Sequence, residues 1–391
     1  MAVDLLVERL TLPELLGGSN SQKVSTGESA GGITPLSLDA NPVVERFLTG
    51  LGFGVFDRSG LTAPYGRNDV WAGPTSTGDQ IFVKRLSGRT ADVVARMRRL
   101  HLFEEVFRAQ PGRPFDVPEY LGRDLEHGLV AYRMITGATG GAGRMVDETF
   151  DDAMARQTGE AVASVHAMVV PDGIQLDGSL PDLPSLDLVN GLPLAVYENV
   201  SHGELEAWRL QQNDLPLVRA LAGLRQREVL ATRVPAHCDL RVDQLLFSGG
   251  RLVLTDWEEF RLADPARDVG SFAGEWLYRS VLDIVTPRGG ASPDGVGLDH
   301  HAVLRLGVAK LERLRPRIES FWSGYRSVSE SVNSDFMVRA TAFAGWHMLD
   351  RLLAGSAYRG LLSGIERAAA GIGRNVLLNP ERFASAIGLA S

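Results

Sequence analysis

The stretch that decides the fold is His237-Cys238-Asp239-Leu240-Arg241-Val242-Asp243-Gln244, which is followed by Leu254-Thr255-Asp256-Trp257-Glu258. Two carboxylates, Asp239 and Asp256, lie 17 positions apart, and the amide of Gln244 lies between them. Apolar runs on either side of the glycine-containing turn at 248–251 predict a β-hairpin. The stretch therefore predicts a loop with one acid, a hairpin, and a second acid at the end of the return strand.

Phosphoryl transfer requires these groups in this order. One acid orients the attacking hydroxyl, while an amide and a second acid hold Mg²⁺ against the phosphates of ATP. The alternative interpretation is a hairpin turn that is merely rich in aspartate. We favour the first interpretation, because the spacing, the order and the side-chain types all agree with it.

The same stretch resembles the His-Gly-Asp and Asp-Trp-Glu segments of aminoglycoside phosphotransferases, which are relatives of protein kinases and choline kinases. The resemblance implies that Asp239 accepts a hydrogen bond from the substrate hydroxyl and that Asp256 bridges Mg²⁺ to the phosphates. It also implies a metal ligand at position 244, where the family normally has asparagine and this chain has Gln244. Cys238 replaces the family's usual glycine, so we expect that this position does not need a positive φ.

Composition excludes several classes of protein. The net charge of −8 argues against a nucleic-acid partner, because phosphate binding needs a basic surface. No apolar run approaches the ~20 residues of a membrane span, and no secretion signal is visible at the N-terminus, so we expect a cytoplasmic protein. Cys238 is the single cysteine, which excludes an internal disulfide and a cysteine-based metal site.

The first half of the chain predicts a nucleotide-binding lobe. Leucines in residues 1–16 predict a short amphipathic helix, and a Gly/Ser-rich stretch follows, so residues 1–50 are expected to form a helix and a flexible linker. Residues 51–136 are expected to be the N-lobe. A strand–loop–strand around Gly66 would cover the ATP phosphates, and Lys84 ends an apolar strand, as the phosphate-binding lysine does in kinase-like folds.

A helix is predicted from Thr90 to about Phe107. Glu104 falls on its apolar face, and a carboxylate on a core-facing stripe needs a partner. We therefore expect a Lys84–Glu104 ion pair, with Glu105 as the second choice.

Two strands between 117 and 135 end where a hinge to the second lobe is expected. By the resemblance, the backbone of Arg133, Met134 and Ile135 would bind adenine. Residues 137–391 are expected to form a mostly helical C-lobe. The predicted class is α+β, a two-lobed protein-kinase-like fold with a small antiparallel sheet in the N-lobe.

Several further side chains near the loop carry expectations. Asp243, Glu258 and Glu259 are candidates for contact with a cationic substrate, although solvent-facing charges explain the two glutamates equally well. We expect His166 to be a packed structural residue. Asp268 is expected to hydrogen-bond the backbone of the catalytic loop.

The leading functional hypothesis is an ATP- and Mg²⁺-dependent phosphotransferase that acts on a hydroxyl. The acceptor is either an aminoglycoside-like small molecule or a Ser/Thr of a precursor peptide, as in natural-product pathways of the lanthipeptide type, where a partner lyase would follow. The alternative is a catalytically weak, pseudokinase-like scaffold that binds a partner protein. The presence of Lys84, Asp239 and Asp256 together argues against the scaffold.

Overall fold

The computed structural model describes residues 35–63, 68–112, 115–181, 183, 186–285, 300–329, 332–357 and 360–390. The predicted N-terminal helix at 1–16 and the loop around Gly66 lie outside these residues. None of the described helices is both long and apolar enough to cross a membrane.

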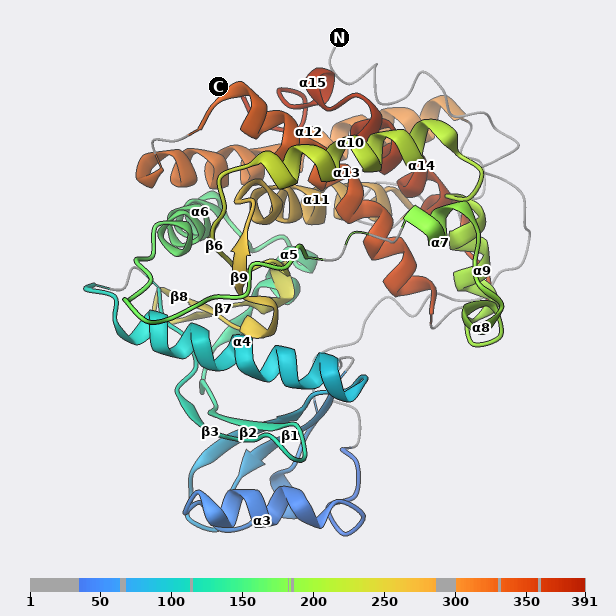
Figure 1. Cartoon of the computed structure of the whole chain (residues 1–391). Helices are drawn as coiled ribbons and strands as arrows, with labels where there is room; N and C mark the ends of the chain where they lie inside the picture. The colour runs from blue at the N-terminus through green and yellow to red at the C-terminus, as the bar shows by residue number, and fades with distance from the viewer. Residues whose placement is uncertain are drawn as a thin grey trace.

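The N-lobe contains one antiparallel sheet in the order β1-β2-β4-β3 (Figure 1). Its strands are β1 (Asp69–Pro74), β2 (Gln80–Arg85), β3 (Tyr120–Asp124) and β4 (Leu129–Arg133). Because side chains alternate along a strand, Ile81 and Val83 of β2 face one way and Lys84 faces the other. The face with Ile81 and Val83 carries its own core.

Helix α3 (Pro42–Gly50) supplies part of that core through Val44 and Leu48, and Leu38 joins them. These residues are fully or almost fully buried. The N-lobe therefore begins before residue 51, where the sequence placed its boundary, and residues 35–50 are part of it.

Helix α4 (Thr90–Arg108) follows β2 and lies between the sheet and the second lobe (Figure 1). Its apolar side chains, among them Met97, Leu100 and Phe103, belong to the large core that fills the C-lobe and not to the core around α3. Leu86 and Val130 of the sheet region join the same core, so the helix packs between the sheet and the C-lobe.

The C-lobe is mostly helical, as predicted. Its helices are α5 (Gly141–Val146), α6 (Asp152–His166), α7 (Leu186–Asn190), α8 (Leu194–Tyr197), α9 (His202–Arg209), α10 (Leu215–Leu230), α11 (Ala266–Leu282), α12 (His300–Val328), α13 (Ser334–Ser356), α14 (Gly364–Leu378) and α15 (Pro380–Phe383). Its short strands are β5 (Thr139–Gly140), β6 (Val234–Ala236), β7 (Leu245–Ser248), β8 (Arg251–Leu254) and β9 (Arg261–Ala263). The predicted hairpin is β7–β8, with Leu245 opposite Leu254. The α+β, two-lobed fold class is confirmed.

Candidate active site

The loop between β6 and β7 is held by α11. Both carboxylate oxygens of Asp268 accept backbone hydrogen bonds, from His237 N–H at 2.7 Å and from Cys238 N–H at 2.8 Å. Burial raises the pKa of Asp268, but hydrogen bonds from His166 and the loop more than offset this and lower it overall. The predicted contact between Asp268 and the loop is confirmed.

His166 is a packed residue, as expected. Its Nδ1 lies 2.9 Å from the Tyr325 hydroxyl and its Nε2 lies 3.1 Å from Asp268. His237 contacts the carbonyl of Thr255 at 2.9 Å and packs on the Trp257 ring. These contacts join the loop to the segment that carries the second acid.

Cys238 has φ +65°, so the expectation that this position does not need a left-handed conformation is wrong. The two N–H groups of 237 and 238 must both point at Asp268, and the turned backbone satisfies this. Burial raises the pKa of the Cys238 thiol well above its ordinary value, which keeps it protonated and unreactive at neutral pH. Asp256 is also left-handed, at φ +66°.

Gln244 contacts the predicted catalytic acid. Its amide nitrogen donates to Asp239 at 3.2 Å, and its amide oxygen accepts the backbone N–H of Arg241 at 3.2 Å. The guanidinium of Arg241 lies 3.8 Å from Asp239 and 3.2 Å from Asp243. Asp239 thus lies between an amide and a cation that fix its orientation.

Lys84 contacts the second acid across 172 residues of sequence. Its ammonium donates to Asp256 at 2.5 Å and lies 2.8 Å from Glu258. Burial lowers the pKa of Lys84, but the two carboxylates reverse this and raise it overall. Burial raises the pKa of Asp256, and Lys84 opposes it strongly enough to lower it overall. Both groups are therefore charged at neutral pH.

The prediction of a Lys84–Glu104 ion pair is wrong. The glutamate that pairs with Lys84 is Glu258. Glu104 lies near Tyr120 and Tyr132 instead. Burial is the largest cause of the raised pKa of both phenols, and the charge of Glu104 raises it further. Glu105 lies 3.6 Å from His101 on the exposed side of α4.

The sequence analysis missed Arg96 of α4. Its guanidinium donates to Glu258 at 2.6 Å, and both side chains are about 95% buried. The signal was present, because Arg96 precedes Leu100 by four positions and Phe103 by seven and so lies on the apolar face.

The model of the phosphotransferase enzyme family matches residues 67–294, which include Lys84, the catalytic loop and Asp256. The chain belongs to the phosphotransferase enzyme family. The resemblance inferred from residues 237–258 is confirmed, and the protein is a phosphotransferase.

Several solved structures are similar to this chain at low sequence identity. An amicoumacin kinase, solved in complex with AMP-PNP, Ca²⁺ and Ami, is 15% identical with a TM-score of 0.50, covering 88% of this chain and 94% of its own. A spectinomycin phosphotransferase is 15% identical with a TM-score of 0.46, covering 85% and 98%. A choline/ethanolamine kinase family protein from Mesorhizobium loti is 18% identical with a TM-score of 0.45, covering 84% and 92%. No curated protein matches the chain significantly.

The three acids proposed for substrate contact differ in their surroundings. Glu258 is buried and paired with two cations. Glu259 pairs with Arg99 at 2.9 Å and with Arg261. The side chain of Asp243 is half-exposed, so of these three acids it is the one that a substrate can reach.

A second acid beside the loop escaped the sequence analysis. Glu275 of α11 lies 2.6 Å from Nε2 of His347 on α13. Burial raises the pKa of Glu275, but His347, Arg351 and Arg241 lower it overall. Arg241 also pairs with Asp243 at 3.2 Å and lies 3.8 Å from Asp239, so the three acids share this cation.

The hinge is only partly open to a nucleotide base. The N–H of Met134 donates to the carbonyl of Gln80 at 2.9 Å, and the N–H of Arg133 donates to Glu119 at 2.9 Å. Two of the three predicted N–H groups are thus engaged within the sheet region. Adenine binding by Arg133, Met134 and Ile135 remains a proposal.

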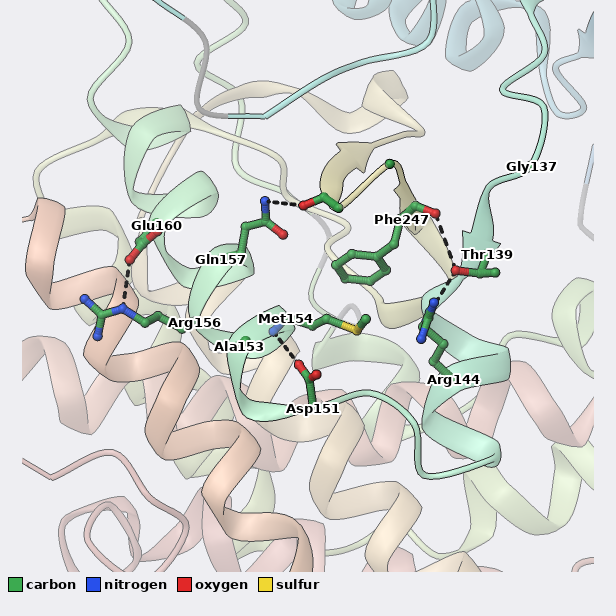
Figure 2. Close-up of a pocket in the computed structure, with 12 residues that line it drawn as sticks. Gly137, Thr139, Arg144, Asp151, Ala153, Met154, Arg156, Gln157, Glu160 and Phe247 are labelled. Carbon is green, nitrogen blue, oxygen red and sulfur yellow. Dashed lines mark hydrogen bonds and ion pairs between the residues drawn. The ribbon is translucent and has the colours of Figure 1, made fainter.

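A separate open cavity of about 660 Å³ lies beside β5 and α6 (Figure 2). Thr139, Arg144, the first half of α6 as far as Glu160, and the β7–β8 turn line it. Arg144 donates to the Thr139 hydroxyl there at 2.8 Å. None of the predicted site residues lines this cavity, so it is distinct from the Asp239–Asp256 site.

Proposed function

We propose that this phosphotransferase moves the γ-phosphate of ATP to a hydroxyl of a small, hydroxylated, amine-bearing molecule. The observation that carries the proposal is the meeting of Lys84 and Asp256, beside a loop in which Gln244 and Arg241 orient Asp239. A scaffold without catalytic function would need none of these groups to converge.

In the proposed reaction the acceptor oxygen forms a bond to the γ-phosphorus while the bond to the bridging oxygen of ADP breaks. Asp239 accepts a hydrogen bond from the acceptor hydroxyl and takes its proton late, so its main contribution is positioning. Lys84 binds the phosphate oxygens. The buried surroundings of Lys84 and Asp256 strengthen these electrostatic contacts.

The donor set fits Mg²⁺, which is usually held by one or two protein oxygens together with substrate phosphates and water. Asp256 would hold it, and we propose the amide oxygen of Gln244 as the second ligand, since its hydrogen bond from Arg241 leaves one lone pair. No group of three His, Cys, Asp or Glu side chains suited to a metal occurs among the described residues, which agrees with a metal shared with the nucleotide. When bound, Mg²⁺ would neutralise charge that develops on the phosphates.

The acceptor class rests on Asp243, which is half-exposed in the loop of Asp239 and shares the cation Arg241 with it. A protonated amine on the acceptor would be attracted to this carboxylate. The structural neighbours include proteins described as kinases of amicoumacin and of aminopropanol, which supports the same class.

The test is incubation with Mg-ATP and two acceptor panels, one of amine-bearing hydroxylated small molecules and one of Ser/Thr-containing precursor peptides. Mass spectrometry would detect an added phosphate. We expect phosphorylation in the first panel. Phosphorylation of peptides alone would replace the proposed acceptor, and nucleotide binding without transfer to either panel would favour the scaffold.

A further inference from the structure

The sequence predicted that helix α4 would supply an acid, Glu104, to pair with Lys84. The helix instead supplies a cation, Arg96, to the site. Arg96 donates to Oε1 of Glu258 at 2.6 Å, and Lys84 lies 2.8 Å from Oε2 of the same residue. Each carboxylate oxygen of Glu258 therefore faces one cation. The acid comes from the segment after β8, two residues beyond Asp256.

The same helix is fixed to that segment by apolar packing. The rings of Phe103 and Trp257 stack with centroids 3.8 Å apart and an interplanar angle of 7°. Phe260 meets Phe103 edge-on at 5.2 Å. Figure 1 shows α4 between the N-lobe sheet and the C-lobe. Helix α4 and residues 256–260 thus form one packed unit, whereas Lys84 projects from the sheet.

Arg96 also reaches the residue before β1 and the segment after β2. Its second amino group donates to Asn68 Oδ1 at 3.2 Å, and its first donates to the carbonyl of Ser87 at 2.8 Å. Asn68 in turn accepts the N–H of Ser87 at 2.9 Å. One guanidinium therefore connects the start of β1, the end of β2 and Glu258.

We propose that Glu258, held by Arg96, is the residue that positions Lys84 for the nucleotide phosphates. This inference rests on the proposed function, in which Asp256 would hold Mg²⁺ and would then be less available to pair with Lys84. Glu258 then remains as the buried carboxylate on Lys84. Because Glu258 belongs to the C-lobe unit, Lys84 is correctly placed only when the sheet and the C-lobe are together.

Isothermal titration with ATP, with and without Mg²⁺, tests the role of Glu258. Glu258→Gln is expected to weaken ATP binding about tenfold in both conditions, because the negative charge that pairs with Lys84 and Arg96 is lost. Glu258→Asp keeps the charge but shortens the side chain by one methylene. It should also weaken ATP binding, because the carboxylate then lies further from Lys84. If Glu258→Gln instead raised only the Mg²⁺ requirement and left Mg²⁺-free binding intact, Glu258 would be a metal ligand and the proposal would be overturned.

The role of Arg96 is tested in the same titration. Arg96→Met should weaken ATP binding in the wild-type background and have a smaller effect in Glu258→Gln, because the part that acts through Glu258 is already lost and only the contacts with Asn68 and Ser87 remain. Independent, additive losses would overturn this dependence. Arg98→Met is the matched control, since it removes a cation from an exposed position of the same helix. It is expected to leave the ATP dissociation constant unchanged, and thermal unfolding by circular dichroism checks that each variant folds.

These titrations separate the inference from the proposed function. If the wild-type protein binds ATP but transfers phosphate to no acceptor, the proposed function fails and the positioning of Lys84 is still measured by the binding constants. A wild-type protein that binds no ATP would overturn both.

Discussion

The backbone N–H of Cys238 donates to the carboxylate of Asp268 at 2.8 Å while Cys238 is in the left-handed conformation. The neighbouring N–H of His237 reaches the same carboxylate. Asp268 therefore imposes on a cysteine a backbone geometry that suits glycine, and the residue that follows is the proposed catalytic acid, Asp239.

Replacing Cys238 by glycine is expected to relieve this strain. A left-handed non-glycine residue costs roughly 1–2 kcal/mol, part of which is offset by the greater freedom of glycine in the unfolded chain. Cys238→Gly should be about 0.5–1 kcal/mol more stable than Cys238→Ala, which removes the thiol but keeps the strain. Urea unfolding of the two variants measures this, and equal stabilities would show that the loop bears no strain here.

Asp239→Asn is expected to lower kcat by about 10²–10⁴-fold, because the group that orients and deprotonates the acceptor is lost. The change meets the acceptor and not the nucleotide, so ATP binding should be nearly unchanged by titration. A variant that lost ATP affinity but kept its rate would reverse the assignment of Asp239 and place it with the nucleotide.

Gln244→Ala is expected to slow transfer by one to two orders of magnitude, or roughly 1.4–3 kcal/mol, and to raise the Mg²⁺ concentration needed for half-maximal rate. Steady-state rates across a Mg²⁺ series give both quantities. A slower rate with an unchanged Mg²⁺ midpoint would show that the amide only orients Asp239, through the 3.2 Å contact. Gln244→Asn shortens the side chain by one methylene and tests whether the loop can move inward.

Asp177 predicts a pH dependence of stability. Burial raises its pKa, but Ser179 and Arg99 outweigh this and lower the pKa from 3.8 to about 2. Since the folded-state pKa lies below the unfolded one, the stabilisation is complete above pH 3.8 and is lost as the pH falls towards 2. Asp177→Asn should cost about 1 kcal/mol at pH 7 after allowance for solvent screening. Urea unfolding at pH 7 and pH 3 should show a smaller difference at the lower pH; a constant difference would contradict the assignment.

The sequence predicted the elements whose signal is local. The β7–β8 hairpin follows from two apolar runs and a glycine turn, and Lys84 follows from strand periodicity. The pairing of Lys84 with Glu258 could not be predicted in this way. The periodicity of a helix shows which residues share a face, but it does not show which other element that face packs against. Helix α4 turns Arg96 to the site, and the acid arrives from a segment more than 150 positions away.

The conformation of Cys238 escaped prediction for a similar reason. Nothing in the neighbouring residues requires a positive φ, and the requirement comes from Asp268, 30 positions later. The N-lobe boundary was placed too late because α3 (Pro42–Gly50) is a helix of only nine residues, too short for a long periodic pattern.

The placement of α4 determines how this chain can be divided. Its sequence lies between two strands of the N-lobe sheet, yet Met97, Leu100 and Phe103 are buried with Trp257 and Phe260. An N-terminal fragment that ends at the hinge would expose the apolar face of α4 to solvent and would be expected to self-associate. The C-terminal fragment would expose the apolar side chains, among them Trp257 and Phe260, that pack on α4 in the whole chain. A two-piece form of the enzyme would therefore need both fragments produced together, whereas recombination between relatives would succeed best when α4 and residues 256–260 come from the same parent.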